Sequence, residues 1–506
     1  MTTTPSVVMI GLDAAEVTVI EELCAAGKLP ALSSLIERGC FGRLESEAPI
    51  FSGGVWPTFY TSKRVPWHGI YHDRLWHYDK MRFETVGHQW LPEKPFWERL
   101  DEKYRIAVID VPMVLGIPKS MNGVIVVGWG THDRVFTGSW PPRLWGELRR
   151  QFGAPTLAGH TVRPRTVPEL LQFKKSLQST TEQVVRLSQS LLGREPWDVF
   201  LVVLGATHRG GHHLWDLSQI EHNSFATETT LGRGLEEVYV ACDRAVGRIV
   251  ANLSEGTKIM VFAVHGMGAN PGWNDRCAEI LRRIQQADAE PRRSRDRKRS
   301  VPSRAIDFVV WRLLPLKVRN QLRNRHYTRE FDWSRTRCFP LKMDHAGYLR
   351  INVKGREPRG IVKPGQEYTD LCNEIREAFL GLRDLDTNEP IVNEIYQVDD
   401  LAPPGAPYRD LLPDLVVVWS GVSAIRSKGI YSKRSGEIRW NTDGRIPSLR
   451  SGNHRSSGWF VAAGDGIEPG TRADGYHIID LVPTVYQWIG AEQAHDFQGN
   501  PISALV

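Results

Sequence analysis

Short apolar runs alternate along the chain with longer amphipathic segments. The short runs predict buried strands over residues 6–12, 106–111, 123–128, 198–204, 258–264, 348–353, 414–418 and 459–462. The longer segments predict helices over residues 14–26, 166–193 and 228–253. Because the strands are apolar on both faces and helices separate them, we expect an α/β fold. Its central sheet should be mostly parallel, with helices on both faces.

This alternation stops between residues 276 and 340, which we interpret as a basic insertion or cap. The predicted core then comprises residues 1–275 and 341–506, and residues 131–190 are a second candidate cap segment. Within the insertion, residues 291–304 form a basic run bounded by prolines. One interpretation is a solvated loop. The other is a flap that carries positive charge toward an anionic substrate or a membrane surface.

Composition limits the classes of protein that remain. The chain has 506 residues, 41% of them hydrophobic and 24% charged, which suits a globular protein with a large core. A formal net charge of +6 is too small an excess to indicate nucleic-acid binding. No apolar run reaches the roughly 18 residues of a membrane span, and no secretory leader pattern is visible. None of the six cysteines forms Cys-x-x-Cys. We therefore expect a cytoplasmic protein without a disulfide scaffold.

Polar residues of kinds that bind metals or act as nucleophiles stand where apolar runs end, or in short glycine-containing segments. They are Asp13, Ser52, His208, His212, His265 and His454. In a parallel α/β sheet the carboxyl ends of the strands meet at one edge, and ligands bind there. We therefore expect these residues, although far apart in the chain, to meet in one metal-bearing pocket.

Two of the histidines, His208 and His212, are four residues apart. At this spacing they share one face of a helical turn, as metal-binding histidine pairs do, although Gly210 and Gly211 between them make a regular helix less certain. A single histidine at a strand end is more often a hydrogen-bonded structural residue. The pair favours metal binding, and a histidine-rich set favours zinc, with manganese or iron as alternatives, over magnesium.

Ser52 lies in Phe-Ser-Gly-Gly-Val-Trp, directly before a predicted helix. A hydroxyl there would lie among free backbone N–H groups that favour a bound phosphate. A nearby divalent metal would make it a nucleophile. The alternative is that Ser52 is an ordinary helix N-cap.

Together these motifs resemble the type I phosphodiesterase/nucleotide pyrophosphatase branch of the alkaline phosphatase superfamily. The resemblance extends over most of the chain, in the expected order. The matching segments are Gly11–Asp13, Lys28–Gly39, Ser52–Ser62, His68–Ile70, Thr207–Trp215, Ala263–Gly268, Asn352–Pro358, Pro413–Val416, Gly452–His454 and Asp480–Thr484. The sulfatase branch is unlike this chain, because Ser52-Gly-Gly-Val-Trp lacks the proline and arginine of Cys/Ser-x-Pro-x-Arg.

The resemblance implies an alkaline-phosphatase-like fold with cap insertions and a two-metal site for phosphoryl transfer. The positions implied for the first metal are His208, His212 and His454. The positions implied for the second metal are Asp13, Ser52, Val264 and His265.

Three of these positions depart from the family pattern. The family's aspartate in Thr-Asp-Arg is His208, which keeps a ligand and yields a three-histidine site. The aspartate of Ser-Asp-His-Gly is Val264, which cannot bind a metal, so the chain carries one or two metals. The usual threonine nucleophile is Ser52. Three other residues offer replacement ligands: Asp275, Asp344 and His345.

The predicted function is a metal-dependent hydrolase of phosphate esters that acts through a covalent phospho-Ser52 intermediate on a small-molecule substrate. Arg209 and Arg455 flank motif histidines and would hold the phosphate, or else form surface ion pairs. Two alternatives remain. One is a transferase that passes the phosphoryl group to an alcohol, and the other is a non-catalytic binding or assembly protein that has lost the second metal site.

Overall fold

The fold is described from a computed structural model. The described residues are 6–87, 93–131, 136–155, 166–217, 229–287, 324, 326–343, 346–440, 448 and 450–506. The basic segment 291–304 and the candidate ligands Asp344 and His345 lie outside these residues. Among the helices of the described ranges, none has the length and apolar character that crossing a bilayer requires.

A sheet of ten strands forms the centre of the molecule, in the order β20-β2-β19-β9-β1-β8-β5-β6-β7, with β21 paired to β2. The strands are β1 (Val7–Leu12), β2 (Cys40–Glu45), β5 (Ile106–Ile109), β6 (Gly123–Val127), β7 (Gly138–Trp140), β8 (Val199–Leu204), β9 (Lys258–Ala263), β19 (Gly458–Ala463), β20 (Thr471–Arg472) and β21 (Tyr476–His477). The strands from β9 to β6 run parallel, whereas β19 pairs antiparallel with both β9 and β2. Every residue of β1 and β8 is buried, which is why these strands are apolar on both faces.

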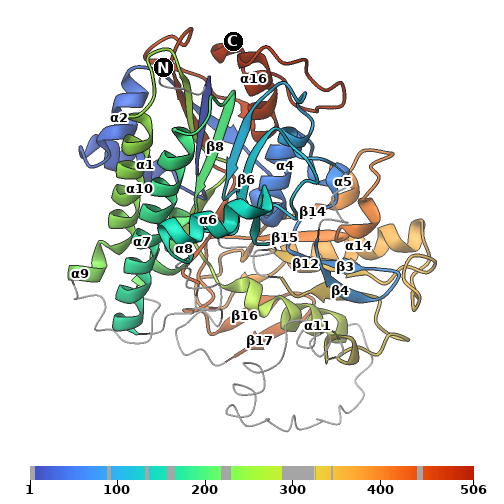
Figure 1. Ribbon diagram of the computed structural model, residues 1–506. Coiled ribbons are helices and arrows are strands. Elements are labelled where there is room, and N and C mark those ends of the chain that lie inside the picture. Colours follow the sequence, from blue (N-terminus) through green and yellow to red (C-terminus); the bar gives the residue numbers. More distant parts are fainter. Residues whose placement is uncertain are drawn as a thin grey trace.

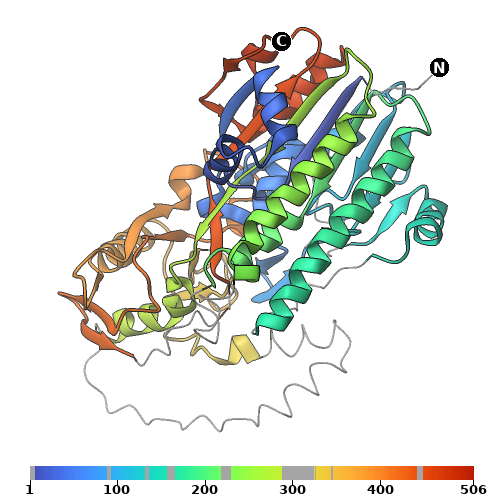
Figure 2. The same cartoon turned by 90° about the vertical axis from the view of Figure 1, so that its left-hand side faces the viewer.

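Helices cover both faces of this sheet (Figure 1). The helices on one face are α1 (Val17–Ala25), α2 (Pro30–Glu37), α6 (Pro142–Phe152), α7 (Val167–Leu192) and α10 (Gly234–Val250). Figure 2 shows α7 and α10 lying side by side along that face. The helices on the other face are α3 (Ala48–Phe51), α4 (Val55–Thr61), α5 (Val65–His68) and α16 (Leu481–Trp488). The predicted α/β architecture is confirmed.

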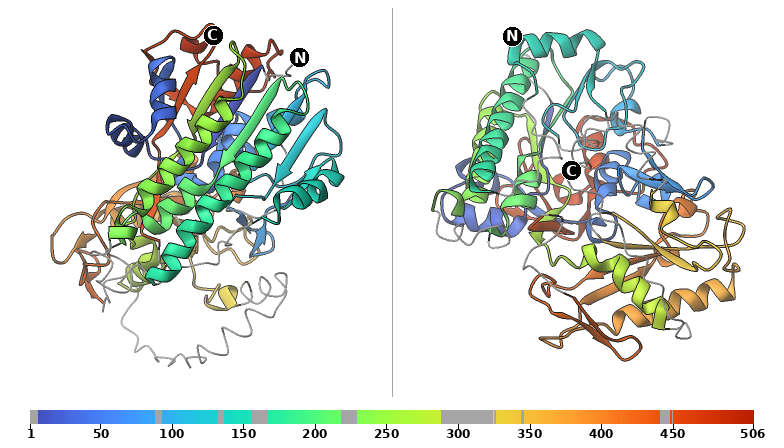
Figure 3. Two further views of the ribbon diagram at one scale, coloured as in Figure 1. Left: turned by 60° about the vertical axis from the view of Figure 1, so that its left-hand side comes forward. Right: turned by 90° about the horizontal axis from the view of Figure 1, so that it is seen from below.

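A second, smaller layer lies beside one end of the main sheet (Figure 3). Four antiparallel strands form it in the order β11-β12-β15-β14, and β13, β16 and β17 form a small sheet next to it. The strands are β11 (Cys338–Leu341), β12 (Gly347–Ile351), β13 (Arg383–Asp384), β14 (Val392–Gln397), β15 (Leu415–Trp419), β16 (Gly429–Ser432) and β17 (Gly436–Arg439). Helices α11 (Cys277–Ala287) and α14 (Gln366–Leu380) contribute to the same layer, which has an apolar cluster of its own. The predicted cap boundary at residue 340 falls within β11.

Short elements complete the described chain. They are the hairpin β3 (Arg74–His77) and β4 (Arg82–Thr85), the ladder β10 (Gly266–Ala269) and β18 (Gly452–Arg455), α8 (Ala206–Leu214), α9 (Thr229–Gly232), α15 (Val398–Leu401), and 3₁₀ turns that include η1 (Ser52–Gly54) and η6 (Trp273–Arg276). Of the candidate cap segment 131–190, β7 pairs with β6 at the edge of the main sheet and α7 covers a face of that sheet. The ladder β10–β18 lies next to α8, and together they bring the predicted histidines to one place.

Candidate metal centre

Helix α8 starts directly after β8 and carries the first two histidines of the site. His208 and His212 lie on one face of the helix, with ring centroids 4.6 Å apart and Nε2 atoms 3.2 Å apart. Gly211 lets the helix approach β10 closely, because a Cβ atom there would lie 2.8 Å from Cγ of Met267. The glycines that made a regular helix uncertain in the sequence therefore allow this helix to pack against the strand.

The third histidine comes from a distant part of the chain. His454 lies on β18, which pairs antiparallel with β10, and its Nε2 atom is 2.8 Å from Nε2 of His208. The candidate ligand atoms of His208, His212 and His454 all lie within 4.8 Å of one another. Two of the three rings are buried and the third is half-buried. Zinc bound tetrahedrally at about 2.0–2.1 Å would require Nε2 atoms about 3.3 Å apart, which is close to the spacing here.

Hydrogen bonding fixes which nitrogen of His212 can bind a metal. Its Nδ1 atom lies 2.8 Å from the carbonyl oxygen of Gly452. Because a carbonyl only accepts hydrogen bonds, Nδ1 carries the proton and Nε2 keeps its lone pair. Metal-binding histidines typically have such a partner on the other ring nitrogen. These three residues therefore fit a transition metal in both donor type and ring orientation.

Asp13 lies at the end of β1, beside this cluster. Its backbone is held on both sides, since its N–H donates to the Leu204 carbonyl and its own carbonyl accepts a 2.7 Å hydrogen bond from Oγ1 of Thr207. Its Oδ1 atom accepts a 2.9 Å hydrogen bond from the indole N–H of Trp56, and its Oδ2 atom lies 3.7 Å from Nδ1 of His208. Asp13 is fully buried, so its carboxylate is shielded from bulk solvent.

His265 follows β9 and joins the cluster through His454. The centroid of its ring lies 4.6 Å from that of His454 and 6.2 Å from that of His208. The preceding residue, Val264, is fully buried in the apolar cluster under α4. Asp275, one of the replacement ligands suggested above, is in η6, where it accepts a hydrogen bond from the backbone N–H of Ser448. It is not part of the histidine cluster, and among the described residues this cluster of three contains no carboxylate.

Ser52 begins η1, between α3 and α4. It is buried, and its Oγ atom has no hydrogen-bond partner in the described part of the chain. The alternative that Ser52 caps a helix is not supported, because the N-cap residue of α4 is Gly54 and no side chain caps that helix. The adjoining glycine is tightly packed, since a Cβ on Gly53 would lie 2.6 Å from the Tyr71 carbonyl oxygen. A buried hydroxyl without a partner costs about 1–3 kcal/mol, so its retention needs an explanation.

A cavity of about 450 Å³ opens where α3 meets β18. Ala48 and Pro49, just before the Ser52 segment, line one side, and His454 and Arg455 line another. Trp419 of β15 contributes from the second layer. Apart from His454, Arg455 is the only titratable side chain among the described residues that line the cavity, so any charge that it places there is positive.

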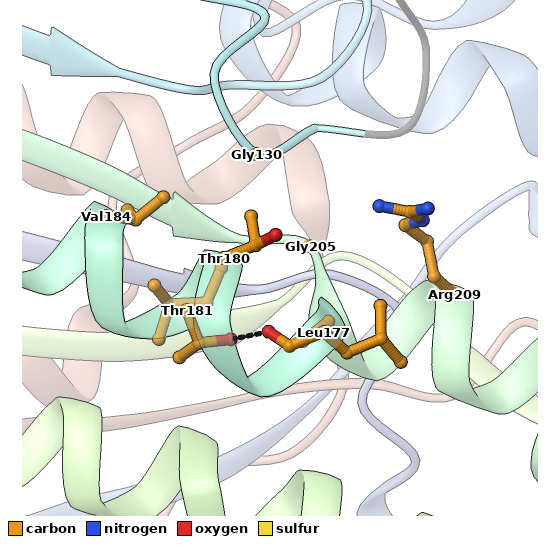
Figure 4. A pocket seen from close by; sticks show the side chains of 9 residues that line it. Gly130, Leu177, Thr180, Thr181, Val184, Gly205 and Arg209 are labelled. Atoms are coloured by element: carbon orange, nitrogen blue, oxygen red, sulfur yellow. Dashed lines mark hydrogen bonds between the residues drawn. The ribbon is translucent and has the colours of Figure 1, made fainter. Parts of the chain in front are cut away.

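Arg209 faces elsewhere. Its guanidinium lies 5.6 Å from the ring centroid of Phe173 on α7 and lines a small crevice between α7 and the turn that joins β8 to α8 (Figure 4). The side chains of Thr180 and Thr181 lie on the α7 side of this crevice, and no histidine is among its described lining residues.

Two residues of the site were missed from the sequence, Trp56 and Glu16. Glu16 caps α1, and its carboxylate accepts 3.0 Å hydrogen bonds from the N–H of Met267 and from Oγ of Ser457. Its own N–H donates to the hydroxyl oxygen of Tyr239, whose pKa is raised well above its usual value by burial. Glu16 thereby ties β1 and α1 to the ladder that carries His454. The available signal was an acidic residue just before a predicted helix, which indicates only a cap.

The comparisons with known proteins agree with this geometry. A family model described as type I phosphodiesterase/nucleotide pyrophosphatase matches residues 7–435. The chain belongs to this family. The resemblance inferred from the sequence motifs is thus confirmed, and the family is named for enzymes that hydrolyse phosphoesters. No curated protein matches the sequence.

Two solved structures resemble this chain at low sequence identity. Phosphonoacetate hydrolase from Sinorhizobium meliloti 1021, in complex with phosphonoacetate, matches with a TM-score of 0.53 and 12% identity, over 97% of this chain and 96% of that one. Murine ectonucleotide pyrophosphatase/phosphodiesterase 5, in an inactive form with AMP, matches with a TM-score of 0.49 and 10% identity, over 97% of each chain. The first match supports the α/β fold described above, with its mostly parallel central sheet.

Proposed function

We propose that this phosphodiesterase-family chain is a metal-dependent hydrolase of small-molecule phosphate esters and that Ser52 is its nucleophile. The observation that carries the proposal is the convergence of the Nε2 atoms of His208, His212 and His454, with separations of 2.8 and 3.2 Å to His208. These three residues would hold the cation. Three neutral nitrogen ligands favour zinc or another transition metal over magnesium. When bound, such a cation stabilises the negative charge that develops on phosphoryl oxygens.

The residues of this chain have distinct roles in the proposed reaction. The Ser52 hydroxyl attacks phosphorus, so that an Oγ–P bond forms and the bond from phosphorus to the leaving oxygen breaks. The serine proton ends on the departing alcohol. Water then cleaves the Oγ–P bond and restores Ser52. Arg455 supplies positive charge to the cavity that adjoins His454 and would bind a non-bridging phosphate oxygen.

The test is the Ser52→Ala variant, assayed with the chromogenic diester bis(p-nitrophenyl) phosphate. We expect kcat to fall by about three orders of magnitude or more, because removal of a nucleophile leaves only binding and electrostatic catalysis. Attack of Ser52 on this diester expels one p-nitrophenol and leaves a p-nitrophenyl phosphoryl group on Oγ. Mass spectrometry after an acid quench should therefore show a Ser52 peptide that carries p-nitrophenyl phosphate in the wild-type protein and none in the variant.

Ser188→Ala is the matched control. Ser188 is also a buried serine whose Oγ atom has no partner among the described residues, but it lies on α7. This variant should keep full activity. If Ser52→Ala were as active as Ser188→Ala, Ser52 would not be the nucleophile.

A further inference from the structure

The second metal position of this family is built differently here. The parallel pairing of β1 with β9 ends at Gly11 and Phe262, and Asp13 and Val264 each directly follow one of these two strands. Val264 lies in the same apolar cluster as Phe262. The position where the family has a carboxylate is therefore occupied by a buried hydrocarbon side chain, which cannot compensate the charge of a second cation, and an uncompensated buried charge is costly.

Trp56 also takes up the contact that Asp13 would make with a cation. Its indole N–H donates to Oδ1 of Asp13 at 2.9 Å, and its ring packs edge-on against Phe59 and Phe262, with centroids 5.8 and 6.0 Å away. The indole fits closely against β1, since a Cβ atom on Gly11 would lie 3.1 Å from Cη2 of Trp56. A metal on this oxygen would lie beside the positive end of the N–H dipole.

The other oxygen of Asp13 faces the three-histidine site. Oδ2 lies 3.7 Å from Nδ1 of His208, and Nε2 of the same ring points at His454 and His212. A carboxylate near Nδ1 favours the proton on that nitrogen and leaves the Nε2 lone pair for a metal. Outer carboxylates commonly orient metal-binding histidines by accepting a hydrogen bond from the other ring nitrogen. At 3.7 Å, the Asp13 oxygen acts on that proton through its charge.

We infer that this chain binds one metal rather than two, and that Asp13 orients His208 instead of holding a second metal. His208, which stands where the family has an aspartate, supplies the ring that Asp13 orients. Val264 offers no ligand atom to a second metal, and the Trp56 N–H occupies one oxygen of Asp13. The inference rests on the proposed metal-dependent function, but it concerns metal content and affinity, which are measured without turnover.

The first measurement is the zinc content of the full chain by mass spectrometry after reconstitution and removal of loosely bound ion. We expect one zinc per chain, lost in His454→Ala. Two zinc ions per chain, or none, would overturn the inference. A protein with one zinc ion but no phosphoesterase activity would keep the inference and refute the proposed function, whereas an active two-zinc protein would do the reverse.

A double-mutant cycle then tests the role of Asp13, with zinc affinity measured by chelator competition. Asp13→Asn should keep one zinc ion per chain and weaken its binding by about 10–100-fold, the usual effect of losing an outer partner. In a His208→Asp background, which keeps a ligand but has no imidazole to orient, Asp13→Asn should leave the affinity unchanged. An equal loss in both backgrounds, or a drop from two ions to one, would refute the orienting role.

The control for loss of a buried carboxylate is Asp243→Asn. Asp243 is also buried and accepts hydrogen bonds from the backbone N–H groups of Ala31 and Leu32, away from the histidines. This variant should lose stability but not zinc affinity. Circular dichroism of each apo-protein separates a folding defect from a binding defect. A second pair of substitutions, Val264→Asp with Trp56→Phe, should raise the zinc content from one to two, and a content that stays at one would count against the proposed blocking of the second position.

Discussion

Acid should lower the stability of the folded protein through His68, which joins the two helices that follow Ser52, α4 and α5. His68 is buried at the end of α5; its Nδ1 atom accepts a 3.1 Å hydrogen bond from the N–H of Ile70, and its Nε2 atom lies 3.0 Å from Oγ1 of Thr58. Since Nδ1 is an acceptor, the proton is on Nε2 and the ring is neutral. Burial lowers the pKa of His68 to about 3; the negative charge of Glu47 opposes this shift, and the positive charge of Lys63 adds to it.

The sign and size of the effect follow from linkage. The unfolded chain protonates this histidine near its ordinary pKa of about 6.5, whereas the folded protein does so only near about 3. Between these values the unfolded state binds the extra proton, so stability is lost as the pH falls. The cost is about 0.2 kcal/mol at pH 7 and about 2 kcal/mol at pH 5, so His68 removes about 2 kcal/mol between the two.

Urea unfolding of the wild-type protein and of His68→Gln, each at pH 7 and pH 5, measures this contribution. Other groups that titrate in the same range contribute equally to both proteins, so the comparison isolates His68. We expect the pH 5 penalty to be about 2 kcal/mol smaller in the variant. His495→Gln, a change at an exposed histidine, should keep the wild-type penalty. If His68→Gln lost as much stability as the wild type on acidification, the burial argument would be refuted.

Two further substitutions test other parts of the molecule. Arg350→Met removes a fully buried guanidinium that binds Glu357 and the carbonyl oxygens of Asp410 and Leu412, and should cost about 3–5 kcal/mol in urea unfolding. Breaking the exposed ion pair Arg439–Glu437 should lower the free energy of unfolding by less than about 1 kcal/mol. A loss as large as that of Arg350→Met would contradict this reasoning. Arg455→Ala should raise KM for a phosphodiester by about 10–100-fold, the value of a charged hydrogen bond, with less effect on kcat. Arg209→Ala should change stability but not KM, because its guanidinium lies over Phe173, and the opposite result would place the phosphate near Arg209.

The central strands could be predicted from the sequence because each is a continuous apolar run buried on both faces. The predicted run 198–204 became β8 (Val199–Leu204), and the run 258–264 became β9 (Lys258–Ala263). The helix expected over 14–26 starts at Val17, because Glu16 is its cap. The local pattern of apolar residues was sufficient to predict a strand or helix wherever burial alone determined that element.

The ladder β10–β18 could not be predicted in this way. Gly266–Ala269 and Gly452–Arg455 have no apolar alternation, and they pair because distant groups, such as the Glu16 carboxylate, hold them in place. The histidines of the candidate site could be predicted from the sequence, because their residue types and the order of the surrounding motifs indicated them. The contact of Trp56 with Asp13 depends on how α4 packs against the sheet, which no local pattern records.

The position of β19 also determines when the central sheet can first be completed during synthesis of the chain. β19 lies between β2 and β9, so both of these earlier strands have an unpaired edge until residues 458–463 have left the ribosome. His454 emerges with the same segment. A nascent chain thus lacks both its third histidine and the strand that closes its sheet until late in translation. If the three histidines bind a metal as proposed, the complete site forms only after residue 454 has been made, whereas a chain truncated before β19 would expose two strand edges to chaperones and proteases.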